Sequence, residues 1–151
     1  MACAKLQEYL DEHHVRYVLL KHSPAFTAQE VAAAAHIPGR EMAKTVVVKL
    51  DGEMALVALP APEMVRMKHL KAETGVSQVE LASEGEFKAR FPDCEAGAMP
   101  PFGNLYDMDT FVEESLAEDE EIAFNAGTHT EVIRMAFADY LELVRPRILS
   151  S

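Results

Sequence analysis

The sequence predicts an α+β domain in which one mixed β-sheet is flanked by short helices. Three observations support this prediction. The length of 151 residues suits a single domain spanning 1–151. Hydrophobic residues make up 49% of the chain, which is enough for one core. Helix-type and strand-type segments are mixed without regular βαβ alternation, so parallel and antiparallel pairs are both expected.

The N-terminal segment predicts a helix, a strand and a second helix. Apolar residues recur at helical spacing over 6–13, and the run at 15–22 is rich in strand formers. Thr27 and Glu30 have the spacing of a capping box, in which the Thr hydroxyl accepts from the Glu30 amide. The alanine-rich helix that they begin should end at 37–39, Ile-Pro-Gly.

A β-hairpin is the clearest local prediction. Two strand-forming runs, 42–50 and 53–60, flank the dipeptide Asp51-Gly52. Both turn residues tolerate the positive φ that a type I′ turn requires. The run 46–48 is three valines, apolar on both faces, so the first strand should be central in the sheet.

Two further helices are expected after the hairpin. Pro62 suits a first helical turn, which predicts a helix over 62–74 that ends at Gly75. Ser83 and Glu86 repeat the capping-box spacing and predict a short helix that ends before position 92, a proline.

The C-terminal third is expected to supply more strands and a last helix. Two Gly and two Pro without periodicity predict a loop over 93–104. Strands are expected at 110–117, 121–127 and 128–137, followed by an amphipathic helix over 137–144.

Charge is distributed unevenly along the chain. The formal net charge is −11, yet residues 1–75 carry nine Lys or Arg and nine Asp or Glu. Residues 76–151 carry five basic and sixteen acidic residues, which accounts for the whole excess. An acidic protein is repelled by polyanions, so broad nucleic-acid binding, and DNA binding in particular, is not expected. Any contact with a nucleic acid should be small and should use the neutral half.

Composition also bears on location and cofactors. No apolar run approaches the roughly 20 residues of a membrane span, and charges interrupt the N-terminus where a signal peptide needs an apolar stretch. We therefore expect a cytoplasmic protein without a membrane partner. Cys3 and Cys94 form no zinc-type cluster, and the eight acids between 107 and 121 follow no ligand spacing. Nucleotide-binding, zincin and hydrolase motifs are missing, so neither a metal nor a cofactor is expected.

Three places in the sequence are candidates for chemistry. Lys44 lies near the start of an apolar central strand, where burying an ammonium is costly unless it reaches a pocket or a partner. This position suits an anchor for phosphate or carboxylate, or a desolvated amine. The alternative is a lysine that extends along the strand end to water. The segment 97–101, Gly-Ala-Met-Pro-Pro, is suited to hold backbone amides in a fixed array, or is an ordinary surface turn. His129 in the turn 126–129 suits a base or a water-positioning group, or is simply solvated. His22 follows a strand and is a further candidate to face a cleft.

Together these segments resemble a known family. His22-Ser-Pro-Ala-Phe-Thr27, Ala43-Lys44-Thr-Val-Val-Val-Lys49, Gly97-Ala-Met-Pro-Pro101 and Ala126-Gly-Thr-His129 occur in the order and spacing of the YbaK/EbsC-type domain. That family includes the editing insertion domain of bacterial prolyl-tRNA synthetases and its free-standing relatives. The resemblance extends over roughly residues 5–145. It implies a YbaK-like fold.

The resemblance also implies an activity, the hydrolysis of the ester between a wrong amino acid (Ala, Cys, Ser or Thr) and its tRNA, often tRNA for proline. Lys44 would hold the terminal adenosine, and the Gly97–Pro101 loop would cradle the aminoacyl group. Gly97, Pro101 and His129 join Lys44 as the implied catalytic residues. The implied substrate contacts are His22, Phe26, Thr27, Thr45, Ala98, Met99, Pro100, Gly127 and Thr128. Glu113 stands where many members have Asp.

The implied mechanism needs no strong nucleophile, because an aminoacyl ester is already activated. A positioned water, donors for the oxyanion and a grip on the adenosine suffice. The implied partner is the acceptor end of aminoacyl-tRNA, with an aminoacyl-tRNA synthetase as a further candidate. The alternative is a non-catalytic binding or regulatory module that partners a synthetase or another protein.

Overall fold

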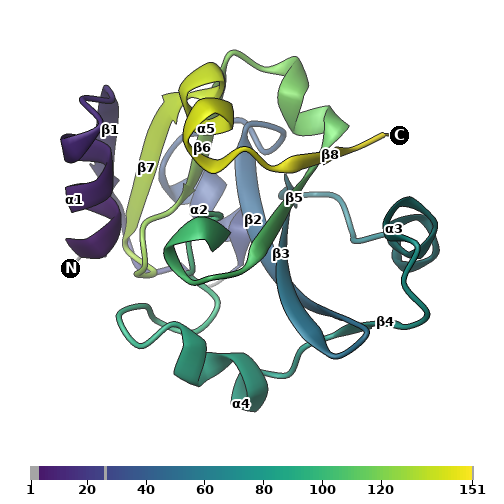
Figure 1. Ribbon diagram of the computed structural model, residues 1–151. Helices are drawn as coiled ribbons and strands as arrows, with labels where there is room; N and C mark the ends of the chain where they lie inside the picture. Colours follow the sequence, from purple (N-terminus) through teal and green to yellow (C-terminus); the bar gives the residue numbers. More distant parts are fainter. Residues whose placement is uncertain (1–3, 26, 151) are drawn as a thin grey trace.

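A computed structural model describes residues 4–25 and 27–150. Its centre is one mixed, strongly curved sheet with the strand order β1-β7-β6-β2-β3-β5-β8, to which β4 adds by pairing with β2 (Figure 1). The strands are β1 Tyr17–Lys21, β2 Met42–Leu50, β3 Glu53–Pro60, β4 Val79–Leu81, β5 Asp109–Glu113, β6 Glu121–Asn125, β7 Glu131–Ala136 and β8 Arg147–Leu149. Parallel and antiparallel pairs are both present, so the predicted α+β fold with a mixed sheet is confirmed.

Short helices surround the sheet. The α-helices are α1 Ala4–Glu12, α2 Ala28–Ala34, α3 Met67–Thr74, α4 Glu84–Phe87 and α5 Phe137–Val144, with 3-10 turns at Lys88–Arg90, Gly103–Leu105 and Glu114–Glu118. In Figure 1, α1 lies beside β1 and β7, whereas α3 stands apart from them, next to β4. Both predicted capping boxes are present, at the starts of α2 and α4.

The predicted hairpin is confirmed. Strands β2 and β3 pair antiparallel from Ala43–Pro60 to Leu50–Glu53. Asp51 and Gly52 have φ values of 51° and 86°, the left-handed conformation that a two-residue type I′ turn requires. Strand β2 has neighbours on both edges, so its predicted central position is also correct.

Some predicted boundaries are wrong. The helix expected from Pro62 begins only at Met67, because Glu63 donates its amide to the Pro60 carbonyl and closes a turn first. The strand expected over 110–117 ends at Glu113, one residue beyond the last β3–β5 pair, Ala58–Val112. The chain then turns in a 3-10 helix that inserts Leu116 into the core.

Two further differences concern strands. The turn expected at 126–129 is confirmed between β6 and β7, but both strands are shorter than the predicted 121–127 and 128–137. The short strands β4 and β8 were not expected, because three residues are too few for a periodic signal.

The core lies on both faces of the sheet. One face packs against α1, α5 and the segment around Phe102, and the other against α2 and α3. In the described part of the chain, no helix has the length and apolar character to cross a membrane.

Candidate active site

The structure brings two of the predicted segments together. The Glu95 amide donates to the Gly127 carbonyl at 2.8 Å, and the Gly127 amide donates to the Ala98 carbonyl at 2.9 Å. The first segment is a loop before β5, and the second is the β6–β7 turn. Backbone bonds of this kind hold two loops in fixed register without the entropy cost of long side chains. The loop Gly97–Pro101 and the turn Ala126–His129 therefore form one unit.

The loop begins with a tight turn. The Ala98 amide donates to the Glu95 carbonyl at 3.0 Å, and Gly97 has a φ of 83° at the third position of this turn. A type II turn requires this left-handed conformation, which favours glycine. The Ala98 amide is thus already used, and the two prolines have none. Among the described residues, no backbone hydrogen bond is made by the amides of Gly97 and Met99.

His129 contacts the loop directly. Its amide donates to Glu95 Oε1 at 2.6 Å, and its ring Nε2 lies 2.8 Å from the Ala96 carbonyl. Since a carbonyl only accepts, the tautomer that fits carries its proton on Nε2. The neighbouring Thr128 hydroxyl donates to Glu131 Oε1 at 3.2 Å in a buried position. These contacts connect both the main chain and the ring of His129 to the segment that begins the loop.

Lys44 and Thr45 lie on opposite faces of β2. Val47 packs in the same apolar cluster as Met99 of the loop. Because side chains alternate along a strand, Thr45 shares this face with the loop, and the half-buried Lys44 side chain leaves on the other. Within the part of the chain that the structure describes, the Lys44 ammonium makes no ion pair or hydrogen bond. Its charge is available to a ligand, but its side chain does not share the loop's face.

Asn125 is a neighbour of Lys44 that the sequence did not single out. The β2–β6 pairing ends at Ala43–Phe124, so Lys44 and Asn125 are the next residues of the two strands and face the same way. Asn125 is 6% exposed, and no hydrogen-bond partner for its Oδ1 lies among the described residues. A buried polar atom without a partner is rare in proteins. No sequence motif singles out Asn125, so its burial beside Lys44 could not be predicted from the sequence.

Glu113 is a buried carboxylate near the same row of side chains. Continuing the β3–β5 register by one residue places it beside Leu59, the cross-strand partner of Lys44. Glu113 is 4% exposed, and its Oε2 lies 3.5 Å from Arg66 Nη2. Burial raises the pKa of this carboxyl, and the Arg66 charge opposes part of that rise.

The predicted N-terminal site residues lie beside the β6–β7 turn. The His22 amide donates to the Thr130 carbonyl at 2.8 Å, and the Ala25 amide to the His129 carbonyl at 3.2 Å. Thr27 caps α2, with its Oγ1 accepting from the Glu30 amide at 3.1 Å. Phe26 lies outside the described residues.

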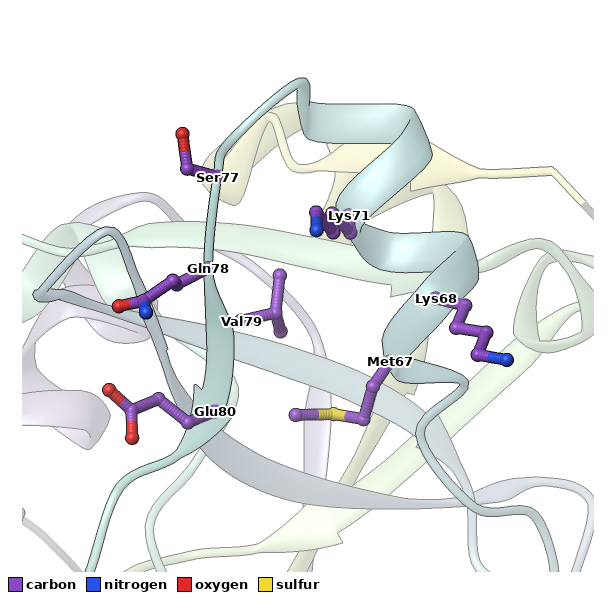
Figure 2. Close-up of a pocket in the computed structure, with 7 residues that line it drawn as sticks. All are labelled: Met67, Lys68, Lys71, Ser77, Gln78, Val79 and Glu80. Atoms are coloured by element: carbon purple, nitrogen blue, oxygen red, sulfur yellow. The ribbon is translucent and has the colours of Figure 1, made fainter.

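A separate pocket of about 380 Å³ lies between α3 and β4 (Figure 2). Met67 and Val79 extend into the space between the helix and the strand, whereas the Lys68 side chain extends away from the strand. None of the predicted site residues lines this pocket. Lys68 and Lys71 are exposed, as expected for a solvated helix face.

No group of three or more His, Cys, Asp or Glu side chains among the described residues is placed to hold a metal ion.

Comparison with known proteins identifies the family. The family model of the aminoacyl-tRNA editing domain matches residues 22–143. The chain is 30% identical over 113 residues to the Multifunctional Ser/Thr-tRNA deacylase ProXp-y of Escherichia coli strain K12, covering 72% of this chain and 67% of that protein. It is also 30% identical over 89 residues to the proline--tRNA ligase of Bacillus mycoides strain KBAB4, covering 59% of this chain and 16% of that enzyme.

Solved structures agree on the fold. Hypothetical protein APE2540 superposes with a TM-score of 0.86 at 19% identity, covering 97% of each chain. A candidate trans-editing enzyme for prolyl tRNA synthetase superposes with a TM-score of 0.83 at 19% identity, covering 98% of this chain and 94% of that one. The chain therefore belongs to the aminoacyl-tRNA editing domain family, which makes it an enzyme of the aminoacyl-tRNA deacylase class.

Proposed function

We propose that this protein is a free-standing trans-editing enzyme that removes a wrongly attached Ser, Thr, Ala or Cys from tRNA, with tRNA for proline as the main carrier. The union of the Gly97–Pro101 loop with the Ala126–His129 turn carries this proposal, because it fixes backbone groups where an ester can be held. The similarity to a Ser/Thr-tRNA deacylase supports testing Ser and Thr first among the four amino acids.

The reaction is the hydrolysis of an ester. A water oxygen forms a bond to the ester carbonyl carbon, and the bond from that carbon to the ribose oxygen breaks. The ribose oxygen takes up a proton, so the products are the free amino acid and tRNA with a free terminal hydroxyl. The amides of Gly97 and Met99 stabilise the charge that develops on the carbonyl oxygen.

Each site residue has a part in this proposal. Lys44 anchors the phosphate or ribose of the terminal adenosine, while Gly97, Pro101 and His129 shape and hold the loop. The remaining contacts to the aminoacyl-adenosine end come from the rest of the loop and its neighbours, namely His22, Phe26, Thr27, Thr45, Ala98, Met99, Pro100, Gly127 and Thr128.

We assign the activation of water to the neighbouring ribose hydroxyl of the substrate, because His129 Nε2 is engaged with the Ala96 carbonyl and Nδ1 of the same ring is buried away from water. An unchanged rate on tRNA whose terminal adenosine lacks that hydroxyl would overturn this assignment.

The charge of −11 limits the contact with tRNA to its acceptor end. This restriction suits a cytoplasmic enzyme that acts beside a synthetase already holding the rest of the tRNA.

A panel of labelled aminoacyl-tRNAs tests the proposal. Ser, Thr, Ala, Cys and Pro are each attached to tRNA for proline and to their cognate tRNA, and release is followed with and without the protein. We expect at least tenfold acceleration over buffer for one or two mischarged species and none for prolyl-tRNA. If every species decays at the buffer rate, the proposal is wrong.

A further inference from the structure

Strand β2 has a gap along one of its edges. Strand β3 covers the whole of the other edge. On the edge with the gap, β6 pairs only with Met42–Ala43 and β4 only with Val48–Leu50. In Figure 1, β6 lies near one end of β2 and β4 near its other end, at the hairpin. No strand of the described chain covers the edge between them, at residues 44–47.

Thr45 directs both of its backbone polar groups into this gap. Glu41 and Val47 present their carbonyls to the same edge, where they accept from the amides of Ala123 at 3.1 Å and Ala82 at 3.0 Å. Because backbone groups alternate between the edges of a strand, the Thr45 N–H and C=O point the same way.

The β6 ladder turns away before it reaches Thr45. Continuing its register would bring the Gly127 amide to the Thr45 carbonyl. That amide instead donates to Ala98 of the loop at 2.9 Å. The Ala98 carbonyl thus takes the amide that would have continued the ladder, and Met99 belongs to the same apolar cluster as Val47 at the other end of the gap. An opening about one residue long results, in the middle of the sheet and beside the candidate active site.

Unpaired backbone groups inside a sheet destabilise the folded protein unless a ligand or water forms hydrogen bonds with them. We propose that the aminoacyl group of the substrate occupies the gap and pairs with Thr45 as a single residue of antiparallel strand. The substrate's α-ammonium donates to the Thr45 carbonyl, and the ester carbonyl oxygen accepts from the Thr45 amide in addition to the amides of Gly97 and Met99. An amino acid carries these two groups at the spacing of one strand residue, and two directly opposed residues exchange both bonds. This inference rests on the proposed deacylase function.

The pairing also fixes the direction of the substrate side chain. Opposed residues in an antiparallel pair project their side chains from the same face. The amino-acid side chain therefore lies beside the Thr45 side chain, on the face that carries Met99. These two side chains are then the ones that distinguish Ser or Thr from a larger amino acid.

Amide hydrogen exchange measured by NMR tests the inference on the unmodified protein. The probe is the seryl amide of 3′-amino-3′-deoxyadenosine, which resembles the ester but is not hydrolysed. We expect the Thr45 amide of the free protein to exchange at least tenfold faster than the Val46 and Val48 amides, which face β3. Saturating probe should slow Thr45 exchange at least tenfold and leave Val46 unchanged. A matched probe with hydroxyl in place of the amine should bind at least tenfold more weakly.

The outcomes separate the two proposals. If the probe shifts the Gly97 and Met99 resonances but leaves Thr45 exchange unchanged, the pairing with Thr45 is wrong and the deacylase site stands. If the probe shifts no resonance at all, both proposals fail. Slow exchange of Thr45 in the free protein would also contradict the inference, because the gap would then be closed.

Discussion

The hydroxyl of Tyr140 donates a hydrogen bond to the main-chain carbonyl of Pro101 at 2.7 Å, in a fully buried position. Tyr140 belongs to α5, whereas Pro101 ends the loop of the candidate active site. Burial raises the pKa of this hydroxyl, so it remains a protonated donor throughout the working pH range. The C-terminal helix therefore fixes one end of the loop, and the turn with His129 fixes the other.

Replacing Tyr140 with Phe tests the contribution of this bond. The ring is kept, but the Pro101 carbonyl loses its donor in a dry environment. We expect the free energy of unfolding to fall by about 1–2 kcal/mol in urea titrations. We also expect kcat/KM for deacylation to fall severalfold at a temperature where the variant is fully folded. Wild-type activity in Tyr140→Phe would show that the loop does not depend on α5.

A second prediction concerns His129, and it distinguishes a residue that positions the loop from one that transfers a proton. In His129→Ala the ring contact to the Ala96 carbonyl is lost, so we expect lower kcat/KM and faster amide exchange at Ala98. The shape of the pH–rate profile should remain that of the wild type. Loss of a limb of that profile in the variant would instead make His129 a general base.

The sequence predicted most of this arrangement where the signals were local. Two capping boxes and the Asp51-Gly52 turn depend on residues three or fewer positions apart, and all three are present. The strands β4 and β8 are three residues long and exist only because β2 and β5 offer edges to pair with. No periodicity within such short segments could have revealed them.

The same limit applies to the site. The order of the four segments implied the family, which is confirmed. The opposite facing of Lys44 and the loop follows from the register of β2, and the burial of Asn125 and Glu113 follows from the sheet around them. Both depend on strand neighbours far away in the sequence.

Thr27 has a structural role that can be separated from substrate contact. Its hydroxyl caps α2, so Thr27→Ala should lower the free energy of unfolding by about 1 kcal/mol, and Thr27→Ser should not. If Thr27 also contacts the substrate, the Ala variant loses kcat/KM severalfold at a temperature where both variants are folded. Equal activity of the two folded variants would limit Thr27 to capping.

Glu113 predicts a pH dependence of stability. Burial raises its folded-state pKa above the ordinary value of 4.5, so the folded protein binds this proton more tightly than the unfolded chain does. The stabilising contribution is complete below pH 4.5 and is lost as the pH rises through the folded-state pKa. Relative to Glu113→Gln, which does not titrate there, the wild type should lose stability from pH 4 to pH 7 in urea unfolding. If the wild type instead became more stable relative to the variant over this range, the ion pair with Arg66 would outweigh the effect of burial on the Glu113 carboxyl.

We propose that Lys44 anchors the substrate of the deacylase, and a matched pair of variants tests this role most directly. Lys44 and Lys49 lie on the same strand, but Lys49 forms ion pairs with Glu86 and Glu80 at the hairpin end. Single-turnover deacylation is measured for wild type, Lys44→Ala and Lys49→Ala on the mischarged tRNA that the wild type cleaves fastest. Loss of a charge-assisted contact worth about 1.5–3 kcal/mol predicts a roughly 10- to 100-fold fall in kcat/KM for Lys44→Ala. Lys49→Ala should stay within about twofold of wild type, because exposed ion pairs contribute little. Equal rates for the two variants would contradict the account.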